Sequence, residues 1–390
     1  MPCSTPSSTG DFTRGGSSPS PASLSPTSPT ARTHRGMISP IFYPILGERV
    51  NGPIGKAIDI LAIFVTLVGI AVSLGLGGLQ IGAGFEQALG LSNVLSLQLI
   101  IIAVTAVAYM LSAATPLEKG VKWLSNISMI VGALLAIYFF VVGPSILIIN
   151  AFVQGIGDYL GALIPMSLTM GAFGQDTEFL SKFTAFYWGW WVAWAPFVGI
   201  FAARISRGRT IREFVVGILV VPSLICMVWF SIAGASGIEL DQTLGGTLSA
   251  AAISDPAAGF FVFLQYYPLP ILTSLATIFL LWIFFVAGAD AGTIVMGSMS
   301  VGGDLDPNRF VRLVWGVVIG LVAAVLLLSG GIESVQQAAV VVGLPFAIIM
   351  LFICYALYKA LRADYREGGL REEGEPQKEP VGQRASNPSE

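Results

Sequence analysis

The sequence predicts an all-α integral membrane protein, and its composition and patterning both point there. Of 390 residues, 54% are apolar and only 11% are charged, whereas roughly a quarter of an ordinary soluble domain is charged. The apolar residues also gather in long runs, and about 20 such residues suffice for one helix to cross a bilayer. The net charge of −3 argues against nucleic acid as a partner.

Eight apolar runs are long enough to be membrane-spanning helices. A weaker stretch, 150–172, is interrupted by Asp158, Pro165 and several glycines, which favours an amphipathic helix in the plane of the membrane interface. Residues 330–333 (GGIE) predict a tight turn between the last two runs. The expected spans are 57–84, 95–115, 127–149, 183–203, 213–237, 269–298, 309–330 and 334–358.

Basic residues alternate from one connection to the next. The connectors 116–126 and 204–213 carry lysines and arginines, as does the segment before the first span, whereas 238–268 carries only carboxylates. Loops rich in Lys and Arg stay in the cytoplasm. We therefore expect a multi-pass plasma-membrane protein whose C-terminus is cytoplasmic.

The chain divides into three parts by composition. Residues 1–36 contain 25 Ser, Thr, Pro or Gly and lack apolar periodicity, which predicts a disordered leader. The membrane domain is expected at 37–358, and 359–390 reads as a charged cytoplasmic tail. With one histidine and three scattered cysteines, the sequence predicts no metal, no cofactor and no enzyme chemistry.

Three features interrupt the apolar pattern. Gly78 and Gly82 form a GxxxG pair within Ser73–Gly84 (SLGLGGLQIGAG), which favours close helix packing over a substrate path along bare backbone. Asp290 lies deep in an expected span, where it is either an ion, proton or gate site or an aspartate bonded to a neighbouring helix. Asp59 lies one turn inside the first span and is expected to be interfacial.

Four of the eight tryptophans fall within 188–194. The helical period places Tyr187, Trp191 and Trp194 on one face, and Trp190, Trp194 and Phe197 on an adjoining stripe. An aromatic belt at the membrane interface is one interpretation. The other is an aromatic cage for a quaternary ammonium ion, which has no hydrogen-bond donor and binds aromatic faces by cation–π attraction.

The stretch FYWGWWVAWAPFVGIFAARISRGRTIREF (186–214) resembles the hallmark segment of the betaine/choline/carnitine transporter (BCCT) family. PILGERV (44–50), the glycine-rich segment and ADAGTIVMGSMS (289–300) match as well. The resemblance covers about 37–360 and implies a LeuT-like inverted-repeat fold and a homotrimer with a trimer contact at 150–172. The eight spans would be helices five to twelve of the family's twelve, so we expect an N-terminally truncated chain.

The resemblance also assigns roles to residues. Trp191 matches the cage tryptophan of the family, and Trp190 and Trp194 line the adjoining path. The cage aromatics of helix four have no counterpart in this sequence, so about half of a cage is expected. The expected pathway or gate aromatics are Phe186, Tyr187 and Phe197.

Ion coupling departs from the family pattern. Sodium-coupled members carry hydroxyl residues where this chain has Ile70, Ala287 and Gly288, and sodium prefers oxygen ligands. Proton coupling or substrate exchange therefore gains weight over sodium. The remaining coupling candidates are Thr66, Ser73 and Asp290.

The resemblance implies a secondary active transporter of a quaternary-ammonium compatible solute, most simply glycine betaine, then choline or carnitine. Substrate would be held by tryptophans during alternating access. The alternative is a non-functional truncated or misannotated fragment of such a transporter. The expected partners are then the small solute, the lipid bilayer and further copies of the chain.

Overall fold

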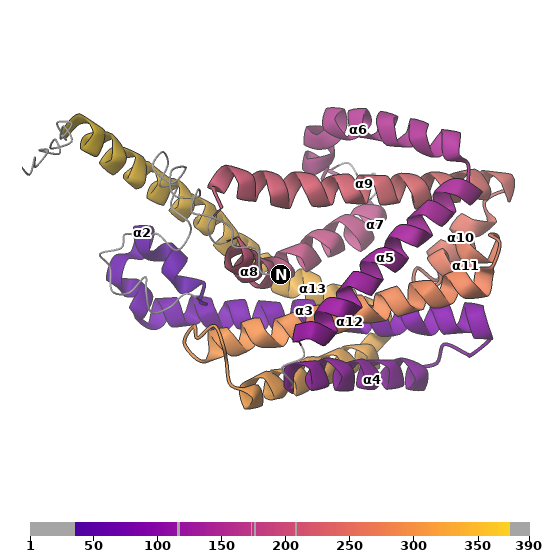
Figure 1. Ribbon diagram of the computed structural model, residues 1–390, viewed down its shortest axis with the longest axis horizontal. Coiled ribbons are helices and arrows are strands. Elements are labelled where there is room, and N and C mark those ends of the chain that lie inside the picture. Colours follow the sequence, from indigo (N-terminus) through magenta and orange to yellow (C-terminus); the bar gives the residue numbers. More distant parts are fainter. Residues whose placement is uncertain (1–35, 115–117, 173, 175–176, 207–208, 375–390) are drawn as a thin grey trace, which may run out of the picture.

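The computed structural model describes residues 36–114, 118–172, 174, 177–206 and 209–374 (Figure 1). The described part of the chain is helical and contains no strand. The leader expected at 1–36 lies outside these ranges except for Gly36, and so do residues 375–390 of the expected tail.

Eight helices of 20 residues or more form the body of the protein. Shorter helical elements precede and connect them. The long helices are α3 (Pro53–Leu89), α4 (Leu95–Ala114), α5 (Glu118–Val142), α6 (Ser145–Leu168), α8 (Phe186–Ile205), α9 (Ile211–Thr243), α12 (Pro270–Ser300) and α13 (Arg309–Gly374). The short ones are η1 (Ser39–Phe42), α2 (Tyr43–Leu46), η2 (Gly47–Asn51), α7 (Thr177–Phe179), the π-helical η3 (Leu180–Ala185), α10 (Thr247–Ser254) and α11 (Gly259–Gln265).

Seven helices of the described chain are long and apolar enough to cross a membrane: α3, α4, α5, α6, α9, α12 and α13. Among them, α13 contains both of the last two expected spans. Its helix is broken at Gly330 (φ 170°, ψ 23°) and Gly331 (φ 60°, ψ −134°), where the turn at 330–333 was predicted. The expected span at 183–203 corresponds to η3 and α8, whose tryptophans and glycines lower the mean hydropathy.

Several helix boundaries differ from the sequence prediction. The expected span 127–149 ends early, because α5 stops at Val142 and α6 begins at Ser145. Pro144 between them has no N–H to continue the helical hydrogen bonds. Of the stretch 150–172, expected to be an amphipathic helix in the interface plane, residues 150–168 belong to α6, a continuous helix that ends at Leu168 and is long and apolar enough to cross a membrane. The α13 helix also extends past residue 358 into the expected tail.

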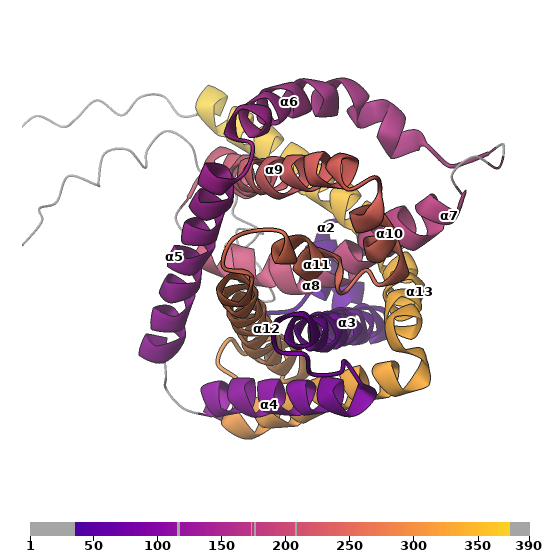
Figure 2. The same cartoon turned by 90° about the vertical axis from the view of Figure 1, so that its right-hand side faces the viewer.

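Helix α3 is the centre of the molecule. Figure 2 looks along it and shows α4, α8, α11, α12 and α13 around it. Its glycines admit these neighbours: a Cβ atom at Gly77 would lie 2.5 Å from the Phe285 ring of α12, and one at Gly75 would lie 3.2 Å from Val335 of α13. Gly78 and Gly82 meet Ile102 and the Asn93 side chain on the α4 side. The glycine-rich segment therefore serves helix packing.

Asp59 fixes the segment that precedes α3. Its Oδ1 accepts hydrogen bonds from the backbone N–H groups of Ile38 (3.0 Å) and Ser39 (2.8 Å). The side chain is buried rather than exposed at a helix end. The carboxylate thus satisfies two backbone donors of the η1 turn, which explains an acidic residue at this depth.

Helix α8 lies between α3 and α13, and glycines bring their backbones together. A Cβ atom at Gly69 would lie 3.0 Å from the carbonyl oxygen of Ala193. On the other side, a Cβ at Gly343 would lie 2.6 Å from the carbonyl oxygen of Gly189. Gly199, further along α8, has open space where its Cβ would be.

We expect Gly189→Ala to destabilise the protein by about 1–3 kcal/mol, because its methyl group would press on the α13 backbone at Val340. The matched change Gly199→Ala should be neutral or stabilising by about 1 kcal/mol, the helix-propensity gain of alanine. The midpoint of thermal unfolding in detergent measures both. Equal midpoints for the two variants would contradict the close approach of α8 and α13.

Candidate functional site

One face of α8 carries a continuous ladder of aromatic rings. Phe186 stacks on Trp190, with ring centroids 5.6 Å apart and planes at 14°. Trp190 meets Trp194 edge to face at 6.5 Å, and Trp194 meets Phe197 edge to face at 5.6 Å. Four of the six aromatic residues assigned from the sequence therefore lie on one stripe, which we call the aromatic ladder.

Ser73 of α3 fixes the two tryptophans of the ladder. Its Oγ accepts hydrogen bonds from Nε1 of Trp190 (3.0 Å) and Nε1 of Trp194 (3.1 Å). Its own hydroxyl donates to the carbonyl oxygen of Gly69 at 2.9 Å, an oxygen that also lies 3.1 Å from Trp194 Nε1. Ser73 is buried, and both acceptor positions of its hydroxyl are used. In this structure it orients indole rings, a role distinct from the ion coupling considered from sequence.

Trp191 and Tyr187 are both exposed, unlike the rings of the ladder. Trp191 is 68% exposed, whereas Trp194 contacts Trp190 and Phe197. The stripe of Trp190, Trp194 and Phe197 expected from the sequence is the one whose rings contact one another in series. Tyr187 is 47% exposed and borders the ladder, with its ring centroid 6.2 Å from that of Trp190.

Thr66, a further coupling candidate on α3, lies one turn before a residue that packs against α12. Thr66 is fully buried, and its Oγ1 has no hydrogen-bond partner among the described residues. One turn further on, Ile70 fills the space over Gly292 of α12. Gly288 faces the ladder, since a Cβ there would lie 3.8 Å from the Trp194 ring. Hydrocarbon thus occupies the space between α3 and α12 at Ile70.

Asp290 faces the opposite way from Gly288 and Gly292. Its Oδ2 accepts a hydrogen bond of 2.9 Å from Ser112 Oγ of α4, whereas its buried Oδ1 has no partner among the described residues. The observed contact matches the interpretation of an aspartate bonded to a neighbouring helix. One carboxylate oxygen remains available for a proton.

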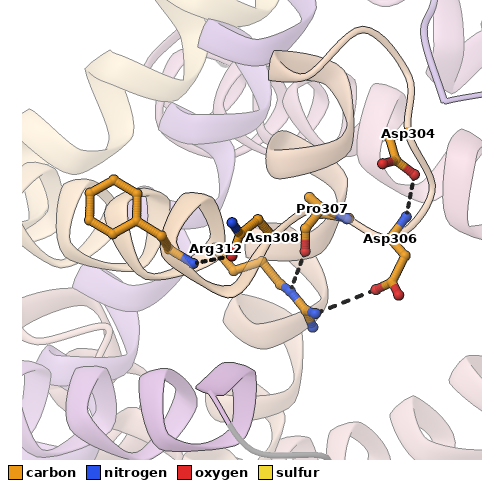
Figure 3. A network of polar contacts seen from close by, with 6 residues as sticks. Asp304, Asp306, Pro307, Asn308 and Arg312 are labelled. Atoms are coloured by element: carbon orange, nitrogen blue, oxygen red, sulfur yellow. Dashed lines mark hydrogen bonds and ion pairs between the residues drawn. The ribbon is translucent and has the colours of Figure 1, made fainter.

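Arg312 is a residue near Asp290 that the sequence analysis did not single out, and it lies within electrostatic range of that carboxylate. Figure 3 shows how the α12–α13 loop holds it: Nε donates to the carbonyl of Pro307 at 3.0 Å, and Nη2 lies 3.4 Å from Asp306 Oδ1. Asn308 caps the start of α13 by accepting from the N–H of Phe310. The stem of Arg312 packs near Gly297 of α12, a contact between two helices that no local sequence signal marks.

Among the described residues, no three His, Cys, Asp or Glu side chains come together in a way that could hold a metal ion. The chemistry available at the ladder is that of aromatic faces whose indole N–H groups are already bonded. Such faces attract cations and present no free donor to them.

The family model of betaine/carnitine/choline transporters matches residues 31–366. The chain belongs to this family. It is 43% identical to the glycine betaine transporter OpuD of Bacillus subtilis over 333 residues, covering 85% of this chain and 64% of the relative. It is 37% identical to the ectoine/hydroxyectoine transporter of Virgibacillus pantothenticus, over 85% of this chain and 65% of the relative.

A third relative is the osmo-dependent choline transporter BetT2 of Acinetobacter baylyi, 39% identical over 83% of this chain and 48% of the relative. The chain therefore spans about half to two thirds of the length of these curated relatives. Members of the family are transporters. The resemblance found in the sequence and the expectation that the chain is not an enzyme are confirmed.

Replacing Ser73 by Ala should leave the Trp190 N–H without a partner and cost roughly 1–3 kcal/mol of stability. Tryptophan emission should change as well, because both indoles lose a bonded oxygen. Thermal unfolding and fluorescence spectra of the purified chain measure the two effects. The control is Ser223→Ala, whose exposed hydroxyl returns to its own helix at Leu219 and should change stability by less than about 0.5 kcal/mol. An unchanged Ser73→Ala protein would show that this clamp does not hold the ladder.

Proposed function

We propose that the chain is a secondary active transporter of a quaternary-ammonium compatible solute, glycine betaine in the first place and choline or carnitine next. The observation that carries the proposal is the pair Trp190 and Trp194, fixed on α8 by the buried Ser73. The names of the relatives, which include transporters of glycine betaine, ectoine and choline, support a solute of this class.

The geometry suits a cation that cannot donate a hydrogen bond. Because the indole N–H groups are turned toward Ser73, the ring faces are what Trp190 and Trp194 offer to a solute. Each ring is worth roughly 0.5–2 kcal/mol to a quaternary ammonium group. The exposed Trp191 ring adds a further face on the neighbouring side of the helix. In this proposal Phe186, Tyr187 and Phe197 border the path on either side of the two tryptophans.

Transport would proceed by alternating access in a LeuT-like inverted-repeat fold, with the described helices as helices five to twelve of that fold. Helices α3, α8 and α12 meet at the ladder, as expected for a site between repeats. We place the C-terminal tail in the cytoplasm of the cell and the chain in a homotrimer. Supporting the trimer, α6 carries large exposed apolar residues along its length, including Ile146, Val153 and Ile164, which another copy could cover.

Sodium is a poor candidate for the coupling ion. Ile70 and the backbone of Gly292 occupy the α3–α12 contact, and Ala287 and Gly288 bring no side-chain oxygen. One turn before Ile70, Thr66 Oγ1 is buried without a hydrogen-bond partner among the described residues. A proton, carried on the free oxygen of Asp290, or an exchange of solutes fits these residues better.

Purified chain reconstituted in liposomes should take up glycine betaine, and Trp190→Ala or Trp194→Ala should raise KM roughly 2- to 30-fold, the equivalent of one cation–π contact. Trp188→Ala is the control, because Trp188 is exposed and lies off the ladder. The readout is uptake of labelled solute. If neither ladder variant differs from the control, the ladder is not the binding site. Absence of uptake by the folded parent chain would favour the alternative of a non-transporting fragment.

Exchange of sodium for potassium in the same vesicles should leave the uptake rate unchanged. A proton gradient, acid outside, should stimulate uptake, and Asp290→Asn should abolish that stimulation because an amide cannot take up a proton. Ser112→Ala is the companion variant: it removes the hydrogen bond but keeps the carboxylate, and stimulation should persist. Strict dependence on sodium would overturn this assignment.

A further inference from the structure

A cavity of about 440 Å³ lies away from the aromatic ladder, where the α5–α6 turn, the end of α9 and the connection from α11 to α12 meet. These elements come together at the right-hand end of Figure 1. Its walls include Gly143, Ser236, Glu239, Thr243, Tyr266 and Tyr267. The volume falls within the range of small-molecule sites.

The polar groups of this cavity suit a cation. Glu239 is the one charged side chain in its lining, and neither of the two ion pairs among the described residues involves it. The last turns of α9, from Ser236 to Thr243, run along the wall, and the C-terminal end of a helix carries partial negative charge. Ser236 is 1% exposed, and its Oγ has no hydrogen-bond partner in the described chain.

Aromatic rings form another wall and are held in place. The Tyr267 ring lies 4.8 Å from Phe263 and 5.5 Å from Phe139 by centroid distance. Tyr138 donates a hydrogen bond to the carbonyl of Pro268, which ties the next residue of this connection to α5. Tyr266 is half exposed beside it. Two tyrosine faces next to a carboxylate make the surroundings that alkylammonium groups prefer.

The surrounding sequence adds to the negative potential. Residues 238–268 contain three carboxylates and no lysine or arginine. The positive-inside rule places this stretch on the side opposite the arginine-rich loops. A concave surface of one sign raises the local concentration of small ions of the other sign.

We propose that this cavity binds a small organic cation of the alkylammonium class. Glu239 balances its charge, the faces of Tyr266 and Tyr267 contact its alkyl groups, and the Ser236 hydroxyl bonds an oxygen on its side arm. The source is a free solute or an ammonium-bearing lipid headgroup. This binding goes beyond the proposed transport and does not depend on it, because none of the ladder residues lines the cavity.

Cysteine protection in the full chain tests the site. Cys3, Cys226 and Cys354 are first replaced by Ser, and Thr243→Cys then places one thiol in the wall. The purified protein in phosphatidylglycerol nanodiscs is treated with a trimethylammonium-bearing methanethiosulfonate, with or without choline. Choline should slow the reaction several-fold, whereas its uncharged carbon analogue, 3,3-dimethyl-1-butanol, should not. A thiol on α10, Ile253→Cys, is exposed outside the cavity and should not be protected.

Two variants in the Thr243→Cys background separate the groups. Glu239→Gln should abolish protection by choline. Ser236→Ala should weaken protection by choline, whose hydroxyl oxygen loses its partner. It should not weaken protection by tetramethylammonium, which has no oxygen to bond. If Ser236→Ala removed protection by both compounds while Glu239 was intact, the assigned role of Ser236 would be contradicted. The source of the ligand is tested in phosphatidylcholine nanodiscs without added choline. If residue 243 is protected there, and Glu239→Gln removes that protection, the lipid headgroup is the ligand.

The proposal is overturned if choline does not slow the reaction at residue 243, protects residue 253 equally, or still protects the Glu239→Gln protein. Trp194→Ala separates this site from the transport proposal, because it should leave protection at residue 243 unchanged while impairing uptake. Impaired uptake with intact protection is the result expected if the two sites are independent, whereas lost protection in Trp194→Ala would contradict the independence of the cavity from the ladder.

Discussion

The structure depends on the close contact between α3 and α8. Helices can approach until their backbones touch only where one of them has no side chain, and Gly69 against Ala193 meets this condition. At that distance one serine, Ser73, reaches two indoles of the facing helix. A bulkier residue at Gly69 would separate the helices and break both hydrogen bonds at once.

The same contact determines which part of each tryptophan side chain remains free to contact a solute. A buried indole N–H has to be bonded, and Ser73 satisfies two of them from within the protein. The ring faces are then the part of Trp190 and Trp194 that has no hydrogen-bonding role within the protein. A solute with a hydrogen-bond donor finds no acceptor at these rings, whereas a trimethylammonium group needs none. The packing of these two helices therefore supports the proposed quaternary-ammonium substrate over solutes that donate hydrogen bonds.

Sequence alone predicted the helices well, because long apolar runs and Gly330-Gly331 are local signals. It also named the residues of the ladder and their neighbours, but it could not decide how α8 is rotated. Trp194 lies three residues from Trp191 and four from Trp190, and the helical period places it beside both. The hydrogen bonds of Trp190 and Trp194 to Ser73 of α3 show which stripe faces that helix. The Asp290–Ser112 bond and the cavity at Glu239 join segments far apart in the chain, so no local pattern could reveal them.

The α3–α12 contact is the part of the structure that bears on the proposed coupling. Helix α12 presents Gly292 to Ile70, and hydrocarbon fills a space where hydroxyl oxygens would be needed to bind sodium. Thr66 keeps a buried hydroxyl one turn away without a partner, and one oxygen cannot replace the hydration shell of an ion. Asp290 turns from the opposite face of α12 toward Ser112. A carboxylate with one bonded and one free oxygen needs only a proton to be neutralised, so in the proposed proton coupling the group that takes up charge lies apart from the surface that meets the ladder.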